Sequence, residues 1–195
     1  MEDRVGPTPR LGMLEIDGAR AAAERVGIPE TMAELSVFRV LLRHEELAAR
    51  VNGLLQQLLW RSCLDARLRE LIIMRIGWSQ AAAYEWTQHW RVARLLEIPE
   101  ADLVAVREWV DSDRFDRADR AVLAATDDTL AAGAISDETW RELEATIPDE
   151  LARMEVVIAI GNWSMFAQLL RSLAIPLEDG VAPWPPDGRA PNDAT

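Results

Sequence analysis

Four polar side chains lie close together in the sequence, in a stretch that is otherwise rich in apolar residues: Glu70, Tyr84, Glu85 and His89. If residues 81–96 form a helix, Glu85 and His89 stand four positions apart and share one face. Glu70 lies among leucines and isoleucines on the preceding predicted helix, where an isolated carboxylate would be costly to bury. A pair of Glu70 with His89 would satisfy both groups, orient the imidazole and raise its basicity, as general acid–base catalysis requires.

The same residues admit simpler interpretations. Glu85 and His89 are also typical of an ion pair on a helix surface, and Glu70 could pair instead with Arg67 or Arg75. A metal site built from Glu70, Glu85 and His89 finds no further support in the sequence, so we expect neither a metal nor a cofactor. The residue types alone therefore leave a catalytic and a structural role open.

The composition narrows the chemistry further. The chain of 195 residues has 33 Asp and Glu against 21 Arg, no Lys, two His, one Cys and a net charge of −12. Without lysine there can be no Schiff-base lysine or P-loop lysine, and Cys63 alone cannot form an intramolecular disulfide or a CxxC pair. The negative charge argues against binding to nucleic acid or to an anionic membrane. No apolar run is long enough to span a bilayer and no signal-peptide pattern is present, so a cytoplasmic location is expected.

Helical patterns run through nearly the whole chain, and the alternating runs typical of strands are absent, which predicts an all-α fold. The predicted helix over 65–77 is apolar on most sides, as is typical of a buried central helix, and Asp65 is its expected N-cap. We predict an N-terminal arm (1–12), a single domain (13–178) and a Pro-rich C-terminal tail (179–195), in which Trp184 suggests docking. Further helices are predicted at 16–25, 32–43, 44–60, 81–96, 99–110, 116–132 and 149–174, with a short one from Ser136.

The stretch LRELIIMRIGWSQAAAYEWTQHWRVARLLEIPEADLVAV resembles the core of the carboxymuconolactone decarboxylase / alkylhydroperoxidase D-like superfamily. The resemblance extends over residues 36–178. In the redox members of the superfamily a Glu is followed, after eleven residues, by CxxCxxxH. Laid on this chain, the Glu falls on Glu70 and the His on His89, while the cysteine positions fall on Ala82 and Glu85. The resemblance implies an alkylhydroperoxidase D-like helical bundle that assembles as a homo-oligomer: a trimer, a hexamer or a dimer.

The missing cysteines argue against a thiol peroxidase, which needs a thiolate nucleophile and a resolving thiol. The resemblance then implies a lyase-like, non-redox enzyme that decarboxylates, eliminates from or isomerises a small carboxylated or lactone substrate without a cofactor. In this interpretation His89 is the acid–base group and Glu70 orients it. Glu85 is a second acid or base, and Tyr84 donates a hydrogen bond to a developing oxyanion. The alternative is a catalytically silent, oligomeric ligand-binding member of the family.

Candidates for substrate binding surround this motif. A carboxylated substrate needs a cation, which an arginine must supply in a chain without lysine, although such an arginine could equally be a solvated surface charge. Tryptophans that share a helix face could line an apolar pocket, or belong instead to the core or to a subunit interface. A polar residue in the apolar last helix, where the family closes its pocket, needs a partner if it is buried. The candidates are Arg75, Arg91, Trp78, Trp86, Trp90 and Asn162.

Overall fold

The structure is a computed structural model that describes residues 8–191. Every regular element within that range is a helix, which confirms the predicted all-α fold. The described chain forms two compact units, one of residues up to 61 together with 169–181, and one of residues 62–168 together with those from 182 onward. Residues 1–7 of the predicted arm and 192–195 of the predicted tail lie outside the described range. The division into one domain with an arm and a tail stays a prediction.

The first unit consists of short helices and one longer one. Its α1 buries a row of alanines, whose small side chains let neighbouring helices approach closely. The helix predicted over 32–43 is broken instead, because Leu35 is extended and the backbone N–H of Ser36 donates to Glu178 Oε1 (2.9 Å). His44 caps α4 by accepting the Leu47 N–H at its Nδ1 (3.3 Å), which is a structural role. The elements are α1 (Ile16–Val26), α2 (Glu30–Ala33), α3 (Ser36–Leu41), the 3-10 turn η1 (Leu42–His44) and α4 (Glu45–Trp60).

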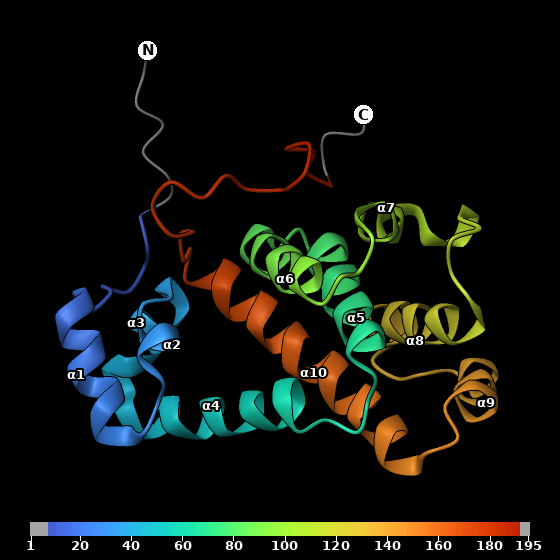
Figure 1. Ribbon diagram of the computed structural model, residues 1–195, viewed down its shortest axis with the longest axis horizontal. Helices are drawn as coiled ribbons and strands as arrows, with labels where there is room; N and C mark the ends of the chain where they lie inside the picture. The colour runs from blue at the N-terminus through green and yellow to red at the C-terminus, as the bar shows by residue number, and fades with distance from the viewer. Residues whose placement is uncertain (1–7, 192–195) are drawn as a thin grey trace. The chain divides into compact units, whose positions relative to one another are not determined.

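The second unit is built around α5 (Ala66–Ser79), which contacts α6, α8 and the 3-10 segment η2 (Figure 1). Five apolar side chains in the middle of α5 are inaccessible to solvent, which confirms the predicted central helix; they are Leu71, Ile72, Ile73, Met74 and Ile76. The other elements are α6 (Ala83–Leu95), α7 (Glu100–Ala105), η2 (Val106–Asp111), α8 (Arg117–Ala132), α9 (Asp137–Thr146) and, as far as residue 168, α10 (Glu150–Ser172).

The helix predicted over 99–110 is also interrupted, since α7 ends at Ala105 and the chain continues as η2. The Arg75 guanidinium donates from Nη1 to the carbonyls of Val106 (3.1 Å) and Arg107 (3.0 Å). These acceptors are thereby taken from the α-helical hydrogen-bonding pattern, and Glu108 departs from helical geometry. The correction could not have been read from the local sequence, because the arginine comes from a different helix.

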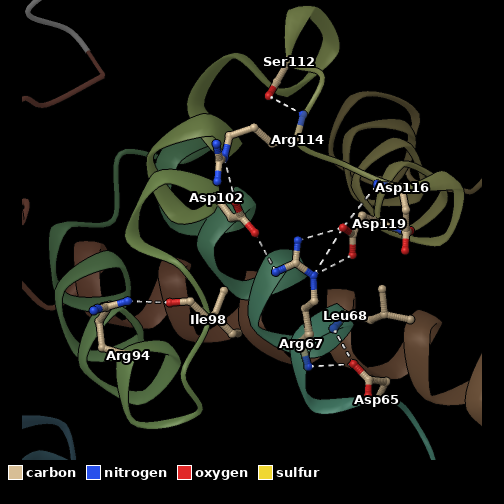
Figure 2. A network of polar contacts seen from close by, with 10 residues as sticks. All are labelled: Asp65, Arg67, Leu68, Arg94, Ile98, Asp102, Ser112, Arg114, Asp116 and Asp119. Carbon is tan, nitrogen blue, oxygen red and sulfur yellow. Dashed lines mark hydrogen bonds and ion pairs between the residues drawn. The ribbon is translucent and has the colours of Figure 1, made fainter.

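A network of charged side chains ties α5 to α7 and α8; we call it the Arg67 cluster (Figure 2). Arg67 Nη1 contacts Asp102 Oδ2 at 2.9 Å, and Arg67 Nη2 contacts Asp119 Oδ2 at 2.8 Å. Arg114 Nε binds the other oxygen of Asp102 at 2.6 Å. Asp119 also closes a capping box with Asp116, the N-cap of α8. The members are Arg67, Asp102, Arg114, Asp116 and Asp119. At the start of α5 itself, Asp65 accepts two backbone N–H groups, as its predicted N-cap role requires.

Within residues 8–191 no helix is both long and apolar enough to cross a bilayer.

Candidate functional site

The α5–α6 hairpin places the residues of the Glu70–His89 motif face to face through a tight turn. Ala81 takes a left-handed conformation (φ 51°) between the helices, and Ala82 N–H donates to the Gly77 carbonyl (2.8 Å). A Cβ on Gly77 would lie 3.0 Å from the backbone nitrogen of Trp86, so only glycine allows this close approach of the two helices. The close approach brings the middle of α5, which carries Glu70, against the face of α6 that carries His89.

His89 is held at Nδ1 by Glu70. The Nδ1 atom lies 2.8 Å from Glu70 Oε2, and the Glu70 side chain is inaccessible to solvent. The other oxygen of Glu70, Oε1, accepts from Arg69 Nε at 3.0 Å, so this buried carboxylate is neutralised by an adjacent guanidinium. An anionic Glu70 therefore fixes the orientation of the imidazole, as a carboxylate partner of a catalytic histidine does.

The second ring nitrogen, Nε2, faces Trp163 and Glu85. The Trp163 indole N–H donates to Nε2 at 3.1 Å, and Glu85 Oε2 lies 3.6 Å from the same nitrogen. Because an indole can only donate, Nε2 accepts in this arrangement and the neutral ring carries its proton on Nδ1, which then donates to Glu70. The Trp163 ring stands edge-on to the imidazole, with the centroids 5.7 Å apart. We call Arg69, Glu70, Glu85 and His89 the His89 cluster.

Burial sets the protonation of this cluster. Loss of solvent around Glu85 raises the pKa of its carboxyl group to about 7, since the opposing attraction of His89 is weaker than the cost of burial. For His89, burial acts to lower the pKa, but the charge and hydrogen bond of Glu70 outweigh it and the pKa is raised. The Trp163 N–H acts against that rise, because its hydrogen bond exists only with the unprotonated Nε2. Glu85 and His89 thus compete for one proton near neutral pH.

Tyr84 is buried on the first turn of α6, next to Glu85. Arg75, in contrast, is already engaged: its Nε and Nη2 bind the two oxygens of Asp127 at 2.6 and 2.9 Å, in addition to the two carbonyls described above. The prediction that Arg75 supplies the cation for a substrate carboxylate therefore loses its basis, because an aspartate has already neutralised the charge. Arg91, the other candidate, is exposed on α6.

The tryptophans of the motif pack against one another and against the C-terminal tail. Trp86 is fully buried, with ring centroids 5.4 Å from Trp78 and 6.0 Å from Trp90. Trp184 of the tail packs against Trp78 (5.9 Å) and Trp86 (6.1 Å), so the tail docks as its tryptophan suggested. Asn162 is buried on α10, and neither its amide nitrogen nor its amide oxygen has a hydrogen-bond partner among the described residues.

Three contacts of this region were not predicted from the sequence. Arg69 was not expected to reach its neighbour Glu70, because successive helical side chains point in different directions. The resemblance placed Trp163, with Asn162 and Met165, where the family closes its pocket, but its hydrogen bond to His89, 74 positions away, was not predicted. Arg107 binds Asp187 of the C-terminal tail, and in the sequence only Trp184 indicated that the tail docks. Among residues 8–191 no group of three or more His, Cys, Asp or Glu side chains is arranged to hold a metal ion.

Residues 45–128 match the family model described as the carboxymuconolactone decarboxylase family. This segment of the chain is similar to that family. In this segment, Ala82 and Glu85 fall on the two cysteine positions of the redox motif, and the single Cys63 is exposed elsewhere, so no CxxC pair exists. No curated protein matches the sequence.

Solved structures share the fold of this chain at low identity. An uncharacterized peroxidase-related protein from Ralstonia eutropha JMP134, described as an alkylhydroperoxidase AhpD core, has a TM-score of 0.72 and 14% identity, covering 90% of this chain and 95% of its own. An uncharacterized peroxidase-related protein from Silicibacter sp. TM1040 has a TM-score of 0.72 and 13% identity, and the match covers 92% of this chain and 97% of that protein. The debrominase Bmp8, in a cysteine-to-alanine form with 2,3,4-tribromopyrrole, has a TM-score of 0.65 and 19% identity, and the match covers 92% of this chain and 94% of that protein. These likenesses establish the alkylhydroperoxidase D-like fold alone.

Proposed function

We propose that this chain is a lyase-like enzyme that transfers a proton to or from a small carboxylated or lactone substrate without a cofactor. The observation that carries the proposal is the position of Glu85: its carboxyl group lies 3.6 Å from His89 Nε2, in a setting where burial holds its pKa at about 7. A general acid or base works best when its pKa is near the working pH. Decarboxylation, elimination and isomerisation all need such a group.

The roles follow from the contacts. Glu70, paired with Arg69, holds the imidazole of His89 in one orientation. When a carboxylate leaves the substrate as CO₂, protonated Glu85 delivers its proton to the carbanion or dienolate that remains. The Glu85–His89 pair then takes up a new proton from solvent, which restores protonated Glu85. In an isomerisation the ionised Glu85–His89 pair removes a proton from one carbon of the substrate and returns it to another. In an elimination the pair removes a proton and passes it to the departing group. Tyr84 remains the proposed donor to a developing oxyanion.

The experiment starts from a panel of five-membered lactones that carry a carboxylate, incubated with the full chain in D₂O. Turnover is followed by NMR through loss of the carboxylate and incorporation of deuterium at the adjacent carbon. The Glu85→Gln variant should lose turnover of any active compound, whereas Glu138→Gln, at an exposed glutamate of α9, should retain it. Equal turnover in both variants would remove Glu85 from the mechanism.

A catalytically silent, ligand-binding role is the second candidate, and one observation favours it. The Trp163 N–H occupies the lone pair of His89 Nε2, the nitrogen that a substrate would need. Under this alternative, calorimetry detects binding of compounds of the same panel, and neither the wild type nor any variant turns them over. Glu85→Gln then changes only the affinity for the ligand. The structurally similar debrominase Bmp8 is in complex with a small heterocycle, 2,3,4-tribromopyrrole, which supports small organic molecules as ligands under either function.

We also propose that the chain self-associates through the outer face of α10. The exposed positions of this face between residues 151 and 168 carry no charge, which is unusual in a chain with a net charge of −12 and lets two copies approach without bringing carboxylates together. A two-fold axis at Ile158 would set Leu151 of each copy against Met165 of the other, because both lie seven residues from Ile158. The apolar members of the face are Leu151, Met154, Val157, Ile158 and Met165.

Light scattering tests this assembly. We expect more than one copy per particle at micromolar concentration and a monomer for Ile158→Asp, which places a charge on the proposed axis. Arg171→Ala, which removes an exposed charge beyond this face, should leave the mass unchanged. A monomeric wild-type chain would contradict the proposal.

A further inference from the structure

Arg107, on η2, is a deeply buried cation in an aromatic setting. Its side chain is only 3% exposed. The guanidinium carbon lies 4.8 Å from the ring centroid of Trp78 and 5.0 Å from that of Trp86, the range of cation–π contacts. A buried arginine needs an anionic partner, since a desolvated and unpaired charge is strongly unfavourable. Whatever supplies that anion is therefore held firmly.

The anion comes from the C-terminal tail. Asp187 binds Arg107 with both oxygens, at 2.8 Å to Nη1 and 2.9 Å to Nη2, and this pairing holds the pKa of the Asp187 carboxyl at about 2. The two partners differ sharply in environment, because the Asp187 side chain is 47% exposed. The cation thus belongs to the body of the unit, while its carboxylate lies near the surface on a segment without helix or strand.

The rest of the tail reaches this site through few polar contacts. Trp184 inserts its ring against Trp78 and Trp86, and its backbone N–H donates to Thr87 Oγ1 (3.2 Å). The Trp86 indole N–H donates to the Pro185 carbonyl (2.8 Å). The tail therefore presents an aromatic ring and a carboxylate side by side, as one flat aromatic acid would. The site also has an unused donor, because the buried Nε of Arg107 has no partner among the described residues.

We propose that Arg107, Trp78 and Trp86 form a binding site for a flat aromatic carboxylic acid, and that Trp184 and Asp187 occupy it when no such ligand is present. The ligand carboxylate replaces that of Asp187 on the guanidinium and its ring replaces that of Trp184. The buried Arg107 is then paired in both states, which removes the main obstacle to exchange. The contacts that carry this proposal involve none of the His89 cluster, so it stands or falls apart from the proton-transfer function.

The test uses indole-3-acetate as probe and its neutral amide, indole-3-acetamide, as the matched ligand without charge. Calorimetry should give Asp187→Asn at least tenfold higher affinity for indole-3-acetate than the wild type, because the internal competitor has lost its charge. Asp179→Asn, at an exposed aspartate eight positions earlier, should bind like the wild type. Adding Arg107→Gln to Asp187→Asn should abolish binding, and the amide should bind to none of these proteins. No gain for Asp187→Asn, or undiminished binding in the double variant, would overturn the proposal.

A measurement on the wild-type chain covers the case in which the double variant does not fold. The backbone amides of Trp184 and Gly188 are hydrogen-bonded in the docked tail, the latter to the Trp184 carbonyl at 2.8 Å. Saturating indole-3-acetate should speed hydrogen exchange at both amides at least tenfold, and indole-3-acetamide should not. Unchanged hydrogen exchange under saturating indole-3-acetate would show that the tail stays docked and that the ligand does not replace it.

Discussion

Two clusters of charge with buried carboxylates start from the same helix and differ in the number of guanidinium groups that they hold. Arg67 and Arg69 lie two positions apart on α5, and each enters a group of carboxylates. In the Arg67 cluster two guanidinium groups, Arg67 and Arg114, serve two buried carboxylates, Asp102 and Asp119. In the His89 cluster a single guanidinium, Arg69, neutralises Glu70, and the second carboxylate, Glu85, has only an imidazole beside it.

The number of guanidinium groups explains the opposite behaviour of the two clusters. Arg67 is held in its charged form, with a raised pKa that comes first from its hydrogen bond to Asp119. Glu85 has no guanidinium, so burial wins and its pKa rises to about 7. In the Arg67 cluster each buried carboxylate has a guanidinium partner, and the ion pairs hold α7 and α8 against α5. In the His89 cluster Glu85 lacks such a partner, so its carboxyl group holds a proton that it can donate. Substitutions should therefore separate stability from activity, and the following predictions test that separation.

The largest expected effect is on activity, from His89→Ala. On a substrate turned over by the wild type, kcat/KM should fall by about two to four orders of magnitude, the usual contribution of a positioned acid–base group. Circular dichroism should show an intact helical fold, because Glu70 keeps its pairing with Arg69. The matched control is His44→Ala, which removes the cap of α4 and should cost some stability while leaving kcat/KM unchanged. A His89→Ala enzyme with full turnover would end the proposed mechanism.

The opposite result is expected in the Arg67 cluster. Arg67→Met leaves Asp119 without a guanidinium and Asp102 with Arg114 alone, which should lower the free energy of unfolding by about 3 kcal/mol, as removal of one partner from a buried pair does. Below the unfolding transition, kcat/KM should stay close to that of the wild type. Urea unfolding measures the first quantity. If Arg67→Met unfolded like the wild type, the cluster would not be what fixes α7 and α8 to α5.

How far the sequence predicted this difference depends on the distance of each partner. The i, i+4 spacing of Glu85 and His89 and the family motif at Glu70 were enough to indicate three side chains that the structure brings together. The helical class and the central position of α5 also followed from apolar periodicity. The catalytic roles of Glu70, Glu85 and His89 stay predictions.

What the sequence could not supply are partners from distant segments. Trp163 reaches His89 from α10, and Asp127 on α8 takes the charge of Arg75, which was expected to face a substrate. Asp187 reaches Arg107 from the tail. Each of these contacts is set by how helices pack, and one sequence shows neither that packing nor the rotamers it selects.

A third prediction concerns pH and the stability of the His89 cluster itself. The folded-state pKa of Glu85 (about 7) lies above its ordinary value of 4.5, so the folded chain holds a proton that the unfolded chain has released between these two values. Stability is thus greatest below pH 4.5 for this group and is lost as the pH rises to 7, by up to about 3 kcal/mol. The raised pKa of His89 acts in the same direction, since its stabilising charge is lost as the pH rises further.

Glu85→Gln removes the carboxyl titration and keeps the shape of the side chain. Its free energy of unfolding should match that of the wild type at pH 4 and exceed it at pH 8, with the difference growing between pH 4.5 and 7. Glu138→Gln should show no such dependence. A variant less stable than the wild type at pH 8 would mean that ionised Glu85 is well stabilised, contrary to the contrast between the two clusters.

The smallest effect is expected from Asp116→Ala, and it tests whether the Arg67 cluster acts as one unit. Loss of an N-cap aspartate costs about 1 kcal/mol, and Ser136→Ala at the N-cap of α9 should cost a similar amount. The two caps differ in their neighbours, since the box partner Asp119 also binds Arg67. Adding Arg67→Met to Asp116→Ala should therefore give a loss that is not the sum of the two, whereas Ser136→Ala with Arg67→Met should be additive. Additivity in both double variants would mean that Asp119 binds Arg67 and caps α8 independently, and that matched charge in this cluster stabilises pair by pair.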